Sequence, residues 1–567
     1  MSESIETNRA LPRVTGVVLA WPAWLVVAIL AALVYVPGLG ERSLWFPDEP
    51  DVAEPAISMV LTGDWTVPRH NDLPWADYPP LTYWASATSA SLLGVSPFAM
   101  RLPVALAAIL LLALTALVVE RLAGRATAVF AGLAMATAPQ FMFQSIMVHP
   151  DMFFALFQGA GIAAYAYGLT RPSTAGSWAW RAAAFAAFGL AVLSKGPLGL
   201  LLPGFILTLW HLSSGFQWRR ILAMAPLTLV ALVMAIPWYL MFARAIGAED
   251  VWRELYLQNF ARFVDADRGH GQPWYYYLVD TWAQWLPWCI FIPGALWAAW
   301  RDRSDPYVRL AFIWFVASFV FLSLATTKRP VYLMPAYPAL AYLIARHGLE
   351  LAERGVWFRA RRGAVVLISS LMVGIGAVTV LGMPFAGLLP VPEKYQPDII
   401  VPSLIIPGVV AGLIVLLGGG AALVQARARC LQAAALVLAL SLIGFALVAH
   451  ALVLPRLDRV RGYTAATLWM RERAGDRPFG LYFANAQHKR CGFRVNDPAY
   501  LPLHDIATPE EAERWLADEG NVLIIRSDVI AQLEVVSPAV AALPRRQFQL
   551  SSNAFTVVGH PVQGGEK

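Results

Sequence analysis

Residues 17–54 read VVLAWPAWLVVAILAALVYVPGLGERSLWFPDEPDVAE. The stretch opens with an almost entirely apolar run of about 20 residues, which is long enough to cross a bilayer as a helix. No small-residue cleavage site precedes the next polar segment, so we predict a retained first span rather than a cleaved signal peptide. Four carboxylates then follow within seven residues, from Asp48 to Glu54. This stretch therefore predicts a membrane-spanning helix that is followed directly by an acidic segment.

The composition indicates that many further segments lie in a bilayer. Hydrophobic residues make up 58% of the 567 residues and charged residues only 14%, whereas soluble domains carry about a quarter charged residues. The net charge of +6 is read as loop charge of a membrane protein, and no nucleic-acid partner is expected. With the first run, about 13 candidate spans are predicted. The others are Phe98–Val119, Ala126–Phe141, Met152–Gly168, Ala182–Leu193, Leu198–Leu212, Ile221–Phe242, Tyr277–Trp300, Val308–Leu324, Val331–Ala345, Ala364–Leu389, Ile399–Val424 and Leu431–Val453.

Arginines in the loops predict the orientation. If the N-terminus is cytoplasmic, every inner loop holds at least two arginines. The short outer loops near Gln144–Pro150 and Ser194–Gly196 hold no cation and one lysine, respectively. This alternation is the positive-inside pattern. Joining the short runs Ala182–Leu193 and Leu198–Leu212 into one helix would invert every later loop, so we expect two separate helices there.

The predicted fold is an α-helical polytopic membrane protein with two domains. Residues 1–455 form the transmembrane domain, with long outer loops at 37–97 and 244–276, and residues 456–567 form a small α/β domain. We expect the long outer loops and the C-terminal domain on the side of the membrane opposite the N-terminus.

Local patterns predict further elements outside the membrane. Amphipathic stretches in the outer loops favour helices that lie in the membrane interface. In the tail, Thr508 precedes a proline and two glutamates, which predicts a capped helix that ends at about Asp518. The amphipathic stretches are Asp51–Gly63, Pro80–Leu93 and Glu249–Arg262, and the predicted strands of the tail are Gly480–Ala484 and Asn521–Arg526.

Charged residues on the predicted outer face are the candidates for chemistry. The acids around Asp48 lie among apolar residues at the membrane surface, where unpaired charge is costly. Asp151 begins a span, where a helix cap is an equally good explanation. Lys195 and the pair Lys328–Arg329 lie in tight turns, where a single cation would usually meet lipid head groups. Several such cations together indicate a phosphate site that faces a carboxylate site.

An ordered set of motifs between about residues 40 and 345 resembles the membrane glycosyltransferases of the GT-C fold. The similar branch holds the protein O-mannosyltransferases and the lipid A aminoarabinose transferases. The motifs are Pro47-Asp48-Glu49, Gly63-Asp64-Trp65-Thr66-Val67-Pro68, Pro79-Pro80-Leu81-Thr82-Tyr83-Trp84, Asp151-Met152, Leu193-Ser194-Lys195-Gly196-Pro197, Ile236-Pro237-Trp238-Tyr239, Asn259-Phe260-Ala261-Arg262-Phe263, Gly271-Gln272-Pro273-Trp274-Tyr275-Tyr276 and Lys328-Arg329-Pro330-Val331-Tyr332-Leu333-Met334-Pro335-Ala336-Tyr337-Pro338.

The resemblance implies transfer of a sugar, 4-amino-4-deoxy-L-arabinose or a hexose, from undecaprenyl phosphate with inversion at the anomeric carbon. The acceptor would be lipid A, another glycan or a protein. The resemblance also implies a bacterial inner membrane, with the N-terminus in the cytoplasm and the active site and C-terminal domain in the periplasm. The implied catalytic acids are Asp48, Glu49 and Asp151, and no metal is required. The implied carrier-phosphate residues are Lys195, Arg262, Tyr337, Lys328 and Arg329. The sugar or acceptor pocket is expected to contain Asp51, Asp77, Tyr78, Tyr83 and Tyr332.

Two departures from the branch pattern leave the sugar and the acceptor open. Aminoarabinose transferases usually carry an arginine where this chain has Asp51, and a Glu-Lys pair where it has Asp77-Tyr78. Losing two cations weakens the case for a phosphate acceptor on lipid A. The alternatives are a protein O-mannosyltransferase-like enzyme and, in another class, a transporter or flippase of lipid-linked sugars. Transporters place polar residues at mid-membrane on broken helices, whereas the informative charges here lie on outer loops.

Overall fold

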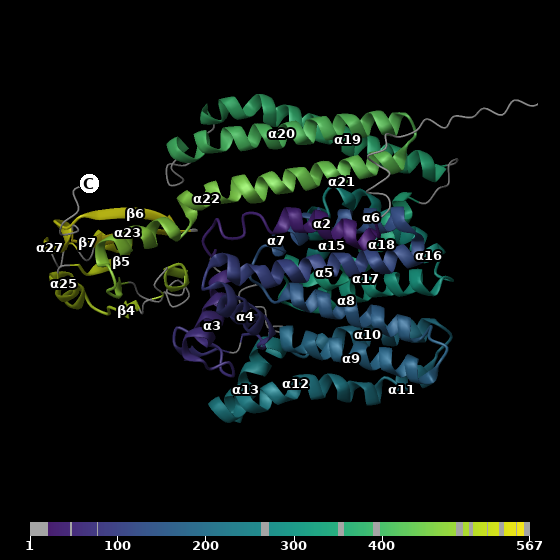
Figure 1. Cartoon of the computed structure of the whole chain (residues 1–567), viewed down its shortest axis with the longest axis horizontal. Coiled ribbons are helices and arrows are strands. Elements are labelled where there is room, and N and C mark those ends of the chain that lie inside the picture. Colours follow the sequence, from purple (N-terminus) through teal and green to yellow (C-terminus); the bar gives the residue numbers. More distant parts are fainter. Residues whose placement is uncertain are drawn as a thin grey trace, which may run out of the picture.

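The protein is a long helical bundle with a small mixed domain at one end (Figure 1). The structure is a computed structural model that describes residues 21–45, 48–75, 77–261, 271–349, 356–388, 397–482, 492–497, 500, 503–518, 520–531, 534, 538–550 and 553–560. In these ranges, seven helices are long and apolar enough to cross a membrane, and three shorter apolar helices accompany them. The prediction of a polytopic helical membrane protein is confirmed.

The first half of the chain supplies the helices that position the site. They are α2 (Ala23–Tyr35), α3 (Asp48–Thr62), α4 (Leu81–Leu93), α5 (Pro97–Ala123), α6 (Arg125–Ala136), α7 (Pro139–Gln144), α8 (Asp151–Gly168), α9 (Thr174–Lys195), α10 (Leu198–Ser213), α11 (Trp218–Leu222), α12 (Ala225–Ile246) and α13 (Ala248–Leu255), with a π-helical turn η1 (Tyr256–Ala261). A two-residue hairpin, β1 (Arg69–His70) and β2 (Leu73–Pro74), lies between α3 and α4. The predicted separation of α9 from α10 is confirmed, and α3, α4 and α13 form within the predicted amphipathic stretches; their place in the membrane interface stays a prediction.

The second half completes the bundle. Its elements are α15 (Tyr276–Gln284), η2 (Trp288–Phe291), α16 (Ile292–Arg301), α17 (Pro306–Leu324), η3 (Pro330–Ala336), α18 (Tyr337–Leu349), α19 (Val356–Gly382), η4 (Met383–Leu388), α20 (Pro397–Arg427), α21 (Leu431–Val448), η6 (Ala449–Val453) and α22 (Leu454–Arg461). Figure 1 shows α19, α20 and α21 along one side of the bundle, with α8, α9, α10 and α12 stacked toward the other.

Several predicted spans are interrupted in the structure. The run Tyr277–Trp300 divides into α15, η2 and α16, because Pro287 and Pro293 remove backbone donors that a continuous helix needs. The run Ala126–Phe141 divides at Pro139 into α6 and α7. The run Val331–Ala345 begins as the 3₁₀ segment η3 and becomes helical only at Tyr337.

The C-terminal domain is a five-stranded mixed sheet with short helices. Its elements are α23 (Thr464–Ala474), β3 (Phe479–Tyr482), β4 (Leu503–Asp505), α25 (Pro509–Ala517), β5 (Val522–Arg526), α27 (Pro538–Ala541), β6 (Arg545–Leu550) and β7 (Asn553–Gly559). The strand order is β4-β3-β5-β7-β6; β3 pairs in parallel with β4 and β5, and β7 pairs antiparallel with β5 and β6. Thr508 accepts a hydrogen bond from the Glu511 amide at 3.2 Å, as the capping pattern predicts.

Candidate active site

The site begins at the N-terminus of α3. Asp48, Glu49 and Asp51 all lie in its first turn, where the helix dipole favours negative charge. Pro50 is tolerated because the first turn needs no intrahelical amide donor. Asp48 and Asp51 are three residues apart and therefore lie on one face of the helix. Both keep part of their side chain exposed, whereas Glu49 between them is fully buried.

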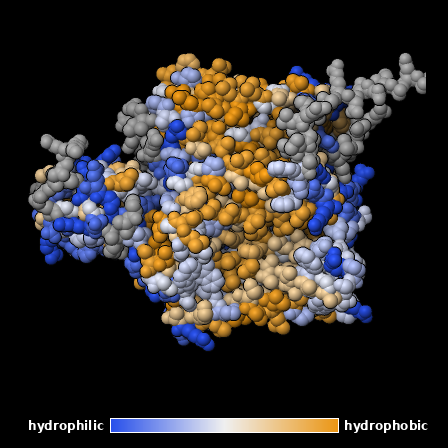
Figure 2. Space-filling view, in the orientation of Figure 1, coloured by the Kyte–Doolittle hydropathy of each residue, from blue (hydrophilic) through white to orange (hydrophobic). Residues whose placement is uncertain are grey.

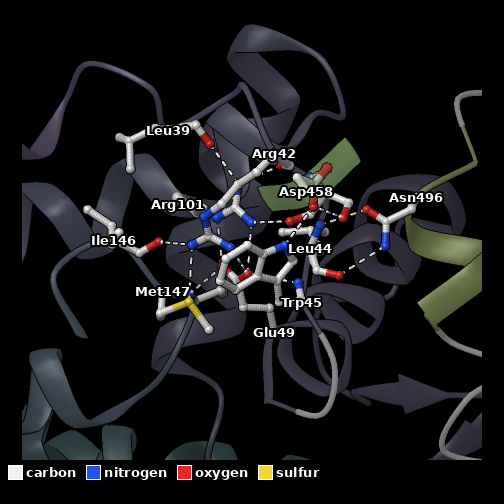
Figure 3. A network of polar contacts seen from close by, with 12 residues as sticks. Leu39, Arg42, Leu44, Trp45, Glu49, Arg101, Ile146, Met147, Asp458 and Asn496 are labelled. Carbon is white, nitrogen blue, oxygen red and sulfur yellow. Dashed lines mark hydrogen bonds and ion pairs between the residues drawn. The ribbon is translucent and has the colours of Figure 1, made fainter. Parts of the chain in front are cut away.

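Glu49 is held by two buried arginines (Figure 3). Arg101 donates from Nε and Nη2 to its two oxygens at 2.7 Å each, and Arg42 donates at 2.7 Å. The backbone amides of Trp45 and Val148 add donors at 2.9 and 3.1 Å. Burial alone would raise the pKa of Glu49, but the charges of Arg101 and Arg42 outweigh it and lower that pKa to about 2. A carboxylate with five donors is suited to positioning α3, and a direct catalytic role for Glu49 stays a prediction.

The Glu49 network also fixes the segment that leads into Asp151. Arg42 donates to the Ile146 carbonyl at 2.8 Å, and Val148 bonds Glu49 itself. Arg101 additionally donates to the carbonyls of Leu39, Arg42 and Ser43 at 2.6–2.9 Å. The loop before α3 and the loop before α8 are therefore tied to one buried carboxylate. Sequence reasoning missed both arginines, although Arg101 inside the apolar run Phe98–Val119 was a charge that required a partner.

Asp48 faces Arg329 from the turn between α17 and η3. Nη2 of Arg329 lies 2.8 and 2.7 Å from the two oxygens of Asp48, so residues 281 positions apart form a direct ion pair. Burial would lower the pKa of Arg329, but the Asp48 carboxylate outweighs it and raises that pKa. Arg329 therefore remains a cation, with part of its side chain exposed beside the catalytic candidate.

Asp151 and Lys195 form the second acid–cation pair of the site. Asp151 is fully buried at the start of α8 and accepts a hydrogen bond from Nζ of Lys195, the last residue of α9. Nδ1 of His149 lies 2.5 Å from the other Asp151 oxygen. Lys195 also lies over the Tyr332 ring, with Nζ 4.2 Å from the ring centroid. The structure thus brings three predicted site residues, Asp151, Lys195 and Tyr332, into direct contact.

Two predicted phosphate residues instead support the turn that carries Arg329. Lys328 is buried, and its Nζ donates to the Gln272 carbonyl at 3.0 Å and to the Ala325 carbonyl. The hydroxyl of Tyr337, also buried, donates to Oε1 of Gln284, whose amide donates to the Pro330 carbonyl at 3.0 Å. Neither side chain is exposed to a ligand in this state. Arg262, the third predicted residue, lies outside the described residues.

The predicted pocket residues have separate surroundings: Tyr332 and Tyr78 lie beside the Asp151 pair, whereas Asp51, Asp77 and Tyr83 lie near one another. Asp51 lies 3.3 Å from Nε2 of His70. Tyr83 is fully buried, and burial together with the nearby Asp77 and Asp51 carboxylates raises its pKa. The Tyr78 ring meets the His149 ring edge-on, with centroids 5.9 Å apart, on the side of Asp151.

The arrangement brings two partly exposed acids and two cations to neighbouring helix ends and turns. Asp48 and Asp51 supply carboxylates that accept hydrogen bonds, while Arg329 and Lys195 supply charges that match phosphate oxygens. Tyr332 links the two acid–cation pairs, because it lies three residues after Arg329 and its ring contacts Lys195. Such a site is suited to a substrate that joins a phosphate to a hydroxyl-rich group.

Comparisons with known proteins show which proteins the chain resembles. Residues 42–250 match the family Dolichyl-phosphate-mannose-protein mannosyltransferase, a range that contains α3 and both Asp151 and Lys195. The chain is 30% identical over 342 residues to the undecaprenyl phosphate-alpha-4-amino-4-deoxy-L-arabinose arabinosyl transferase of Erwinia tasmaniensis, covering 58% of this chain and 60% of that protein. The protein of the same name from Pseudomonas paraeruginosa is 31% identical over 349 residues, covering 60% and 62%.

A solved structure extends the likeness to the whole fold. ArnT from Cupriavidus metallidurans bound to undecaprenyl phosphate matches with a TM-score of 0.76 and 23% identity, covering 98% of this chain and 100% of that one. The sequence matches are shorter, since the chain spans about 60% of the length of the curated relatives it matches. The predicted GT-C fold and the resemblance to the aminoarabinose transferase branch are confirmed.

Proposed function

We propose that this protein transfers a sugar from undecaprenyl phosphate to an acceptor at the outer face of the inner membrane. The observation that carries the proposal is the pairing of Asp48 with Arg329 and of Asp151 with Lys195. These pairs place acids beside phosphate-binding cations at the ends of helices that flank the membrane. The likeness to undecaprenyl-phosphate-dependent transferases supports the same reading.

Lys195 and Arg329 would receive the carrier phosphate. As the acceptor oxygen attacks the anomeric carbon, the bond from that carbon to the phosphate oxygen breaks and undecaprenyl phosphate leaves with the electron pair. Fixed cations at the leaving oxygen stabilise the developing charge by several kcal/mol. Attack from the opposite face inverts the anomeric centre. Arg262, from the second outer loop, is proposed as a further phosphate ligand.

Asp48 would act on the acceptor. Both of its oxygens are engaged by Arg329, so they are not free to contact an acceptor hydroxyl until another anion competes for that arginine. The donor phosphate is such an anion, and its arrival would release Asp48 beside the acceptor. A hydroxyl acceptor would give its proton to Asp48 as general base. Donor binding would in this way precede activation of the acceptor.

The proposed substrates are an undecaprenyl-phosphate-linked 4-amino-4-deoxy-L-arabinose or hexose and a lipid A-type acceptor. Asp51 and Asp77 make the acceptor side of the pocket acidic, and carboxylates bind hydroxyl or amine groups rather than phosphate. We therefore propose a sugar hydroxyl of the acceptor as the attacking group. A protein hydroxyl is the alternative.

The direct test is transfer by purified protein in liposomes. Undecaprenyl-phosphate aminoarabinose and lipid A are supplied, and mass spectrometry follows the mass of one added sugar. The wild-type protein is expected to glycosylate the acceptor, and Asp48→Asn to lose at least about 100-fold in rate while keeping its Tm. The matched control is Asp250→Asn, an acid of α13 that is half exposed and pairs with the exposed Arg253, and this variant should retain activity. Full activity of Asp48→Asn would remove the assignment, and movement of donor across the membrane without transfer would favour a flippase.

A further inference from the structure

The C-terminal domain reaches the buried side of α3 through Arg494. Nη1 of Arg494 lies 3.1 Å from Oε1 of Glu54 and 2.9 Å from Oδ1 of Asp72. Glu54 is only 1% exposed, so this ion pair is shielded from solvent on the Glu54 side. The neighbouring Val495 is buried in the apolar cluster that contains Val52 and Ala53 of α3. The first outer loop and the C-terminal domain thus share one core.

The ion pair continues through His70 to Asp51. Nε2 of His70 lies 3.7 Å from Oε2 of Glu54 and 3.3 Å from Oδ1 of Asp51. Nδ1 of His70 lies 3.1 Å from the Asn71 amide nitrogen, so Nε2 is the ring nitrogen that faces the two carboxylates. The ring stacks on Trp75, with centroids 4.7 Å apart. Three largely buried side chains therefore hold one partly exposed carboxylate.

A second set of contacts fixes the chain immediately before α3. Asp458 accepts hydrogen bonds from the Ser43 hydroxyl and from Nε1 of Trp45, both at 2.6 Å. Oδ1 of Asn496 accepts from the Leu44 amide at 2.7 Å, and its amide donates to the Leu44 carbonyl at 3.1 Å. Figure 3 shows Asp458 and Asn496 on the side of the loop that faces away from Glu49. These contacts hold the loop before α3 in place. The contacts from Arg494 through Glu54 and His70 lead instead to the side chain of Asp51.

We propose that Arg494 is a positioning residue for acceptor binding, which acts through Glu54 and His70 to aim the Asp51 carboxylate at an acceptor hydroxyl. The inference rests on the proposed function and deepens it, because it assigns acceptor recognition to α3 together with the C-terminal domain. A carboxylate accepts hydrogen bonds and repels phosphate, so the group recognised is a hydroxyl on a glycan. Removing Arg494 takes away the cation that fixes the Glu54 carboxylate, so the contacts from Glu54 to His70 and from His70 to Asp51 are no longer held in place.

The test separates acceptor binding from donor binding in the full-length protein in liposomes. With undecaprenyl-phosphate aminoarabinose and lipid A as probes, Arg494→Gln is expected to raise the acceptor KM about tenfold, because a carboxylate displaced by a fraction of an ångström orients its partner poorly. The donor KM should change less than about twofold, since Lys195 and Arg329 are untouched. Arg494→Lys, which keeps the charge, should restore most of the acceptor affinity.

Two further variants make the test specific. Arg526→Gln removes an arginine of the same domain that pairs with the exposed Asp528, and it should leave both KM values unchanged. Glu54→Gln should raise the acceptor KM alone, and adding Arg494→Gln to it should produce little further change, because both residues act through one path.

The outcomes distinguish the inference from the function it rests on. Wild-type transfer with an unaltered acceptor KM in Arg494→Gln would overturn the inference and leave the proposed function intact. A parallel fall in kcat, Tm and affinity for both substrates, unrepaired by Arg494→Lys, would also overturn it, since that pattern is general misfolding. No transfer by the wild-type protein would overturn both.

Discussion

Adjacent residues in this site meet very different surroundings. Asp48 is partly exposed and faces Arg329, while Glu49 is buried between Arg42 and Arg101. A helix turns by about 100° per residue, so neighbours point to different sides. The same contrast separates buried Lys328 from partly exposed Arg329. Charge alone therefore does not identify the residues that meet substrate.

The two lysines give a matched prediction on carrier binding. Lys195→Gln should weaken binding of undecaprenyl phosphate about tenfold, because it removes a charged phosphate donor worth about 1–2 kcal/mol. Lys328→Gln should leave that affinity within about twofold and lower the Tm, since Lys328 bonds backbone carbonyls. Binding is measured by tryptophan fluorescence with undecaprenyl phosphate in detergent. Equal loss in both variants would contradict the separation of binding from support.

Glu49 gives a prediction on pH and stability. Its pKa falls from 4.5 to about 2 on folding, so its ionised form stabilises the protein above pH 4.5 and that stability is lost as the pH falls toward 2. The shift corresponds to about 3 kcal/mol. Glu49→Gln should therefore have a lower Tm than wild type at pH 7, and the difference should shrink as the pH falls from 4.5 to 2. A Tm difference that stays constant over this window would show that Glu49 is not held as an anion.

Sequence reasoning found the outer-face charges but not their partners. Asp48, Asp151 and Lys195 were placed near one another because they follow or precede predicted spans on the same side, and the structure confirms the contact of Asp151 with Lys195. The pairing of Asp48 with Arg329 depends on how α3 and η3 pack, which no local pattern encodes. The contacts Arg494–Glu54–His70–Asp51 join residues from the two domains; Asp51 is a predicted pocket residue, but no pattern in the sequence links Arg494 to it.

At the scale of elements, the site depends on the packing of α8 against α9. Asp151 begins α8 and Lys195 ends α9, so these helix ends must stay together for the ion pair to form. Gly161 permits the close approach, since a Cβ there would meet the Phe188 ring and lie 2.9 Å from the Ala184 carbonyl oxygen. Helix breaks were less well predicted: an apolar run with prolines divides into α15, η2 and α16, whereas α12 and α20 continue through internal prolines.

Gly161 gives the prediction at this scale. Gly161→Ala should destabilise the protein by about 1–3 kcal/mol through overpacking and should reduce transfer by separating Asp151 from Lys195. Gly204→Ala, in α10, is the matched control, because nothing lies within 4 Å of the added carbon. Its Tm should stay the same or rise slightly, since alanine favours a helix over glycine. Equal Tm values for the two variants would show that α8 and α9 have room to adjust.

At the scale of the whole molecule, the surface divides into a broad apolar belt and polar ends. Figure 2 shows hydrophobic residues over the middle of the bundle and hydrophilic residues at its two ends and on the C-terminal domain. Exposed apolar side chains of α12, α19 and α20 contribute to this surface, among them Val233, Val378 and Ile406. A belt of this kind is buried in lipid. The predicted division at residue 455 remains a proposal, and the shared core of Val495 with α3 means that the C-terminal domain and the first outer loop form one functional end.

The central claim is that acids and cations from separate loops meet at one end of the bundle to bind a lipid-linked sugar phosphate. The most direct measurement is an experimental structure of the protein with undecaprenyl phosphate in a lipid nanodisc. We expect phosphate density in contact with Lys195 and Arg329, and Asp48 no longer paired with Arg329. The polyprenyl chain should extend from the phosphate along the apolar belt. Phosphate bound at the opposite end of the bundle, or away from both cations with Asp48 still paired, would contradict it.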